Sequence, residues 1–151
     1  MMNWILVVMG AIASIIVAMI VGGLMAPARL DIARTIRIAA PRDRVWQVVR
    51  EVQHIPDWAP HLPTLEVLTE TAPEALTVRL RNDSQEVVGE WRLQLVANEG
   101  RTELSVFESS VTTNPIARFL RGLRNRNARV DSFLSGVAAR LGDTGAAPRE
   151  A

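Results

Sequence analysis

Hydrophobic residues are spread unevenly along the chain, and their longest run lies at the N-terminus. Residues 4–25 contain no charged side chain. These 22 residues, at 1.5 Å per residue, would form a helix about 33 Å long, which matches the hydrocarbon core of a bilayer. The pattern therefore predicts one transmembrane helix, and we assign residues 1–28 to an N-terminal membrane anchor.

A cleaved signal peptide is the main alternative for this segment, because Ala26-Pro27-Ala28 resembles a small-residue cleavage site. However, residues 1–3 supply no Lys or Arg, and the apolar run exceeds the usual h-region of 7–15 residues. An uncleaved anchor is therefore favoured. The positive-inside rule places the following domain on the cytoplasmic side of a bacterial inner membrane, because five arginines follow the run: Arg29, Arg34, Arg37, Arg42 and Arg44.

Small residues recur every four positions in the apolar run, at Gly10, Ser14, Ala18 and Gly22. This spacing places them on one helix face, where they allow close helix–helix approach. It indicates either a homodimer formed through this face or the ordinary abundance of small residues in membrane helices.

Beyond the anchor, apolar and polar positions follow the periods of strands and helices. Alternation predicts five strands with one buried face, at 34–40, 64–70, 75–82, 87–97 and 102–112. Apolar residues at helical spacing predict a helix over 42–52. Asn114-Pro115 opens a longer stripe with steps of three and four, which predicts one long helix to about Leu141.

The fold class is therefore α+β, an antiparallel sheet of about five strands covered by a long C-terminal helix. The domain is expected over residues 29–143, and residues 144–151 are expected to be disordered.

Composition excludes several classes of function. The chain has no cysteine, so disulfides and thiolate metal sites are absent, and its net charge of +1 gives no support for nucleic-acid binding. The two histidines, His54 and His61, lack the spacing of a metal site, so no metal is expected. No glycine-rich phosphate loop or nucleophile motif is present, and no cofactor is expected.

Three segments together carry a resemblance to a known family: Ala39-Ala40-Pro41 leading to Val45-Trp46, Asp57-Trp58-Ala59-Pro60, and the last hairpin running into Asn114-Pro115 and the terminal helix. Over residues 34–143 the order of elements resembles the START / Bet v 1-like superfamily, also called SRPBCC or polyketide cyclase/dehydrase-like proteins. The resemblance implies a helix-grip fold, in which a curved sheet wraps the terminal helix around an apolar cavity. It also implies binding of lipids, sterols, polyketides or quinones, with a minority of enzymes. Five strands are fewer than the usual six or seven, so a small, shallow or open cavity is expected.

Candidate ligand-cavity residues are the large apolar side chains and one amide near the expected sheet–helix interface. Plain core packing is the alternative role for the aromatic residues. Asn127 interrupts the helical stripe, so it either binds a ligand head group or marks a bend in the helix. The candidates are Trp46, Trp58, Trp91, Val106, Phe119, Leu123 and Asn127.

Two further features carry charge. If Leu104 and Val106 face the helix, period-two alternation turns Glu108 inward, where it is a weak candidate for an acid or base; otherwise Glu108 reaches water and Phe107 is buried. Five arginines within residues 118–129 form either an anionic-lipid contact or a solvated helix face.

These observations favour a membrane-anchored binding module for a hydrophobic small molecule. A structural or regulatory membrane protein that acts through protein partners is the first alternative. A cyclase- or dehydratase-like enzyme is the second, and non-catalytic binding is favoured over it.

Overall fold

The computed structural model describes residues 2–51 and 62–151, which divide into two compact units. The first unit joins Met1–Arg29 to Val111–Arg126, and the second joins Leu30–Ser110 to Asn127–Ala151. The first unit is therefore built from two segments that are far apart in the sequence. Trp58, His54 and His61 lie outside the described residues.

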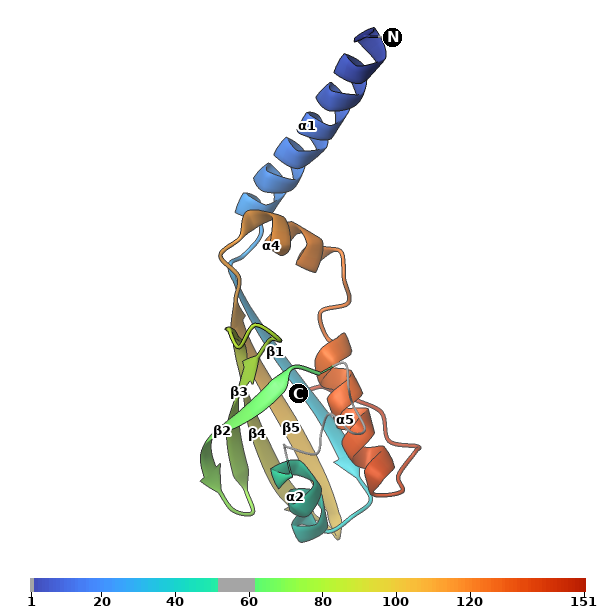
Figure 1. Cartoon of the computed structure of the whole chain (residues 1–151). Coiled ribbons are helices and arrows are strands. Elements are labelled where there is room, and N and C mark those ends of the chain that lie inside the picture. The colour runs from blue at the N-terminus through green and yellow to red at the C-terminus, as the bar shows by residue number, and fades with distance from the viewer. Residues whose placement is uncertain (1, 52–61) are drawn as a thin grey trace. The chain divides into compact units, whose positions relative to one another are not determined.

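The first unit consists of two helices, α1 (Met2–Met25) and α4 (Pro115–Gly122) (Figure 1). α1 is exposed along most of its length, and among the described residues it alone is long and apolar enough to cross a membrane. α4 begins with a side-chain cap, because Asn114 Oδ1 accepts hydrogen bonds from the backbone N–H groups of Ile116 and Ala117. Pro115 at the first helical position is compatible with this cap, since no intrahelical partner is required there.

The second unit is built on an antiparallel sheet with the strand order β2-β3-β4-β5-β1-β6. The five strands predicted from alternation are confirmed, with β1 beginning five residues earlier than expected. The inward positions of the other four strands are mostly buried apolar side chains, as half-buried strands require, whereas in the strand over 64–71 only Leu65 is buried. The bounds are β1 Arg29–Ile38, β2 Thr64–Thr71, β3 Ala75–Arg81, β4 Val87–Asn98 and β5 Arg101–Val111.

A sixth strand, β6 (Arg149–Glu150), lies in the tail that was expected to be disordered. It pairs with Arg34 and Thr35 of β1. The Arg34 side chain holds this arrangement, donating hydrogen bonds to Asp131 Oδ1 at 2.7 Å and to the Pro148 carbonyl oxygen at 3.3 Å. Two residues are too few to show a strand pattern in sequence.

The single long terminal helix predicted from the apolar stripe is wrong. The chain forms α4, ends it at Gly122, and begins a second helix, α5 (Ala128–Arg140), in the other unit. The six residues from Gly122 to Asn127 include one glycine and two asparagines, which are weak helix formers. The apolar period continues through this break, so the stripe alone could not reveal it.

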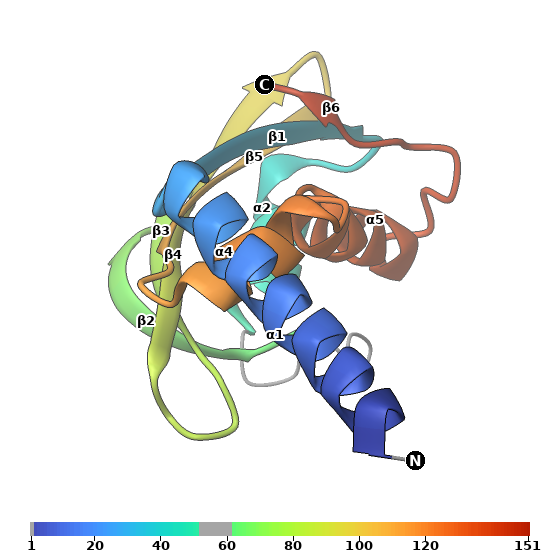
Figure 2. The same ribbon diagram turned by 90° about the horizontal axis from the view of Figure 1, so that it is seen from above.

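α5 and α2 (Arg42–Arg50) lie on the concave side of the curved sheet (Figure 2). α5 is the principal cover of the apolar face, as expected for a helix-grip arrangement. The core buries Val45, Trp46 and Val49 from α2, and Val130, Phe133, Leu134, Val137 and Ala138 from α5.

The break divides the predicted stripe into residues with different structural roles, and this can be measured. Leu134 is fully buried, whereas the side chain of Leu123 is 71% exposed. Leu134→Ala should lower the free energy of unfolding by about 2–5 kcal/mol, and Leu123→Ala should change it by less than about 0.5 kcal/mol. Denaturant titration of the full chain in non-ionic detergent, followed by tryptophan fluorescence, checks both values. Equal losses would mean that one continuous helix covers the sheet.

Candidate ligand-binding site

Glu108 points into the interior of the second unit. Its side chain is only 1% exposed, whereas the neighbouring Phe107 is 38% exposed. The inward alternative for Glu108 is therefore correct, and the alternative in which it reaches water is wrong. Period-two alternation along β5 places Glu108 on the same face as Leu104 and Val106.

Both carboxylate oxygens of Glu108 accept hydrogen bonds. Trp91 lies directly opposite in the β4–β5 register, and its Nε1 donates to Oε2 at 2.7 Å. Arg129, in the first turn of α5, donates from Nη2 to Oε1 at 2.5 Å. These two donors come from the sheet and from the helix, so the carboxylate joins the two layers.

Aromatic rings flank this polar group. The Trp91 and Phe133 ring centroids are 5.0 Å apart at an interplanar angle of 55°, which is a favourable tilted arrangement. Trp91 is fully buried, and the Arg129 side chain is 36% exposed. The set Glu108, Arg129, Trp91 and Phe133, here called the interior cluster, therefore extends from the dry core toward solvent through the guanidinium.

α5 is too short to cover the full length of the sheet. Its 13 residues extend about 20 Å, whereas the 12 residues of β4 extend about 40 Å. Small inward residues lie one step beyond the interior cluster on the strands: a Cβ added at Gly89 would lie 3.2 Å from the Cβ of Ser110. Gly89 and Ser110 themselves therefore contribute little side-chain bulk to the inner face of the sheet at this step.

The structure brings together only part of the predicted ligand-cavity set. Trp46, Trp91 and Val106 are buried in one core cluster of the second unit. Phe119 and Leu123 belong to the first unit, and their assignment to a sheet–helix cavity stays a prediction.

Asn127 is partly buried at the N-cap position of α5. This position agrees with the bend alternative, because the helix is interrupted there. Asn127 therefore marks the start of α5, which a continuous helical stripe had hidden.

The predicted small-residue face of α1 is partly occupied within the first unit. A Cβ added at Gly22 would lie 2.8 Å from Cδ2 of Phe119, so the Phe119 ring covers this end of the face. Around Gly10 the same test meets nothing within 4 Å. A homodimer through Gly10, Ser14 and Ala18 stays a prediction.

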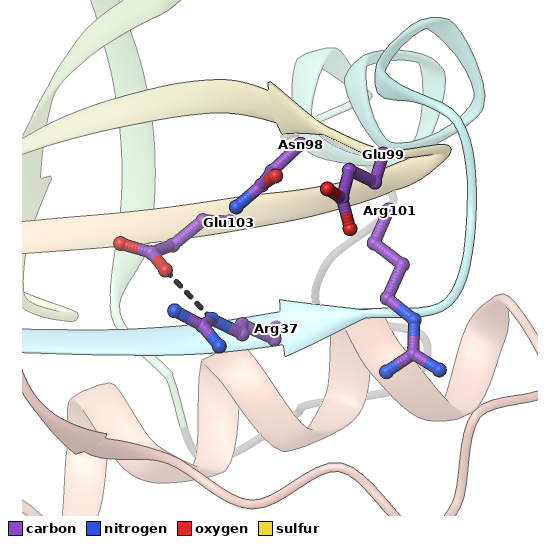
Figure 3. Close-up of a pocket in the computed structure, with 5 residues that line it drawn as sticks. All are labelled: Arg37, Asn98, Glu99, Arg101 and Glu103. Atoms are coloured by element: carbon purple, nitrogen blue, oxygen red, sulfur yellow. Dashed lines mark hydrogen bonds and ion pairs between the residues drawn. The ribbon is translucent and has the colours of Figure 1, made fainter.

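A polar hollow of about 300 Å³ lies at the β4–β5 turn (Figure 3). Glu103 accepts hydrogen bonds there from Arg37 at 3.0 Å and from Arg149 at 3.3 Å. An apolar ligand would have to desolvate these charges, which is costly, so the hollow does not suit a hydrophobic molecule. It is lined by Arg37, Asn98, Glu99, Arg101 and Glu103.

No group of three or more His, Asp or Glu side chains within residues 2–51 and 62–151 is arranged to hold a metal ion. The donor set of the interior cluster, one carboxylate with an indole and a guanidinium, is instead suited to hydrogen bonding.

Arg129 is the residue that sequence reasoning missed. The sequence analysis placed it only among the five arginines of a lipid-contacting or solvated helix face, whereas its side chain reaches Glu108 from the first turn of α5. The only sequence signal was indirect, since an inward carboxylate requires a cationic or hydrogen-bonding partner.

Comparison with known protein families finds one match. A family model described as "Polyketide cyclase / dehydrase and lipid transport" matches residues 29–122. A search of curated proteins finds no match.

Solved structures show the same fold at low sequence identity. The Zhui aromatase/cyclase from Streptomyces sp. R1128 is 18% identical with a TM-score of 0.51, and the alignment covers 76% of this chain and 94% of that one. A conserved protein from Geobacillus kaustophilus is 13% identical with a TM-score of 0.58, covering 78% and 99%. A protein from Thermus thermophilus is 15% identical with a TM-score of 0.54, covering 77% and 99%.

The interior cluster predicts unequal effects of removing its two charges. Arg129→Met leaves the buried Glu108 without its cation and should destabilise the fold by roughly 3–5 kcal/mol. Glu108→Gln should cost less, because the partly exposed guanidinium can reach water. Denaturant titration of both variants and of the double variant measures the coupling between them.

The exposed Arg37–Glu103 pair supplies a matched control. Arg37→Met should change stability by less than about 1 kcal/mol, as for other surface ion pairs. A loss in Arg129→Met no larger than in Arg37→Met would contradict the buried-pair description.

Proposed function

Because the chain belongs to the polyketide cyclase / dehydrase and lipid transport family, we propose that its second unit binds a hydrophobic small molecule between the sheet and α5. We also propose that α1 anchors the protein in the membrane. The ligand is a lipid or a lipid-like molecule such as a quinone or polyketide, with an apolar body and at least one polar oxygen.

The interior cluster is the observation that carries this proposal. A protein that only needed a filled core would gain nothing from a buried ion pair, because apolar residues of similar volume are often as stable or more stable. In a binding site the same pair has a use. The Arg129 guanidinium has five N–H donors, one of which donates to Glu108 Oε1. Glu108 thus holds the guanidinium in position while another N–H can donate to a ligand oxygen.

The apolar body of the ligand would pack on the aromatic and aliphatic side chains beside the cluster. Burial of apolar surface contributes roughly 25 cal/mol per Å², so no covalent step is needed for tight binding. The space for the ligand is expected beyond the first turn of α5, where Gly89 and Ser110 present little bulk.

An enzymatic function has weaker support. Neither oxygen of Glu108 is directed at open space, because one accepts from Trp91 and the other from Arg129. A general base needs a free oxygen within hydrogen-bond reach of the substrate proton. The geometry therefore favours a positioning role for Glu108 over acid–base catalysis.

Ligand binding can be tested by native mass spectrometry of the full chain, released from non-ionic detergent after incubation with bacterial membrane lipids. The native chain should carry an added mass of lipid size. Ser110→Leu should reduce the bound fraction at least tenfold, because the larger side chain fills the inner face beside Glu108.

Ser109→Leu is the matched control, since Ser109 is the adjacent residue on the opposite face of β5. It should leave the bound fraction unchanged. A chain without added mass under all conditions would contradict binding and favour action through protein partners. Equal losses in both serine variants would contradict the location of the site.

The membrane anchor is supported by packing at the C-terminal end of α1. Gly23 is buried, and Arg121 donates a hydrogen bond to the Pro27 carbonyl oxygen at 2.7 Å. The Ala28 carbonyl oxygen accepts from the Thr112 N–H at 2.9 Å. Cleavage after Ala28 would remove the residues on which α4 packs, so an integral role for α1 is more consistent with this unit than a discarded signal peptide.

Retention of α1 has a direct test in bacterial cells. The membrane-bound protein should keep the mass of the full chain, 16.6 kDa, and should resist extraction at alkaline pH. The positive-inside rule predicts that the second unit is protected from protease added to the periplasmic side. A mature protein that begins after Ala28 would contradict the anchor.

A further inference from the structure

α4 is tied to the last turn of α1 by close backbone packing. A Cβ added at Gly23 would lie 1.7 Å from the Pro115 carbonyl oxygen, so no larger residue fits there without moving α4. The Phe119 ring lies over the neighbouring Gly22. One edge of α4 is therefore fixed against the C-terminal end of the apolar helix.

Hydrogen bonds from α4 also reach the chain just after the end of α1. Arg121 donates to Thr112 Oγ1 at 2.8 Å and to the Pro27 carbonyl oxygen, which lies two residues after α1 ends. A membrane-spanning α1 of 24 residues is about 36 Å long, slightly more than the hydrocarbon core. Its last turn then lies at the boundary between lipid and water, and α4 must lie there too.

The exposed surface of α4 and the following turn has the composition of an interfacial segment. Leu120 is 46% exposed and Leu123 is 71% exposed. Between Glu108 and Asp131 the sequence contains five arginines and no acidic residue. Exposed apolar side chains interleaved with arginine are typical of segments that lie on anionic lipid.

Arg118 contributes a half-buried guanidinium to α4. Its Nη2 donates to the Thr113 carbonyl oxygen at 2.8 Å. Its Nε is a buried side-chain nitrogen without a hydrogen-bond partner. Because Nε is buried, only the terminal nitrogens of this guanidinium could meet a phosphate oxygen, with which guanidinium forms strong charge-assisted hydrogen bonds.

We propose that residues 115–126 form a second membrane contact, which docks on the headgroups of anionic phospholipids in the bilayer that α1 spans. Leu120 and Leu123 enter the headgroup region, and Arg118, Arg124 and Arg126 contact phosphate. This inference rests on the anchor proposed above, and it makes the strength of membrane attachment depend on lipid charge.

The experiment uses the full chain, whose lack of cysteine allows a single label. Leu123→Cys carries an environment-sensitive NBD fluorophore, and the protein is reconstituted into vesicles of phosphatidylcholine alone or with 30% phosphatidylglycerol. In the anionic vesicles the emission should shift to the blue and be quenched by a spin-labelled lipid. In neutral vesicles, or in anionic vesicles at high salt, the label should emit at the wavelength of NBD in water and should not be quenched.

Charge removal distinguishes specific docking from general attraction. Arg124→Gln with Arg126→Gln should reduce the docked-to-undocked ratio about 25-fold, roughly fivefold for each arginine. The matched control, Arg92→Gln with Arg140→Gln, removes the same charge from exposed positions in the second unit and should leave the ratio unchanged. Equal effects of the two pairs would overturn the proposal.

Failure of the anchor and failure of the docking give different results. A chain that alkaline treatment extracts from the vesicles would refute the anchor. A chain that resists extraction while its label reports water in both lipid mixtures would refute the docking alone.

Gly23→Val should release α4 and lower the quenching, whereas Gly10→Val, where nothing lies within 4 Å, should not. Equal quenching in the two glycine variants would contradict the attachment of α4 to α1.

Discussion

The second unit depends on a buried carboxylate that must have a cation. Glu108 is held by the alternation of β5 on the inner face of the sheet, at 1% exposure, and an isolated charge there would be strongly unfavourable. Arg129 supplies the counter-charge from the first turn of α5. This requirement ties the first turn of α5 to β5, in agreement with the face that buries Val130 and Leu134.

The strands could be predicted from the sequence because their determinants are local. Leu76, Val78 and Leu80 alternate with polar residues, and a half-buried strand needs nothing more. The terminal helix could not be predicted correctly, because Leu120, Leu123, Asn127 and Val130 keep a helical period across a break. The weak helix formers after Gly122 indicated a helix break, but hydrophobic periodicity depends only on the spacing of apolar residues.

The site was less predictable than the fold. Alternation indicated that Glu108 could face inward, but its partner lies 21 residues away on a different element, and only tertiary packing of α5 on the sheet brings the two together. Trp91 was predicted as a lining residue, yet its hydrogen bond to Glu108 depends on cross-strand register, which a single sequence does not specify. β6 was missed for a similar reason, because the ion pair of Arg34 with Asp131 is a tertiary contact.

The contact between Gly23 and Pro115 restricts how this chain can be rearranged in evolution. Membrane anchors are commonly treated as interchangeable modules, since any sufficiently apolar helix can span a bilayer. Here the last turn of α1 also packs against α4, which lies between β5 and α5 in the sequence. With α1 as the proposed anchor, replacing it by an unrelated apolar helix would keep the attachment to lipid and lose the contact with α4. α1 and α4 therefore form one packed unit, in which a larger residue at Gly23 would require α4 to move.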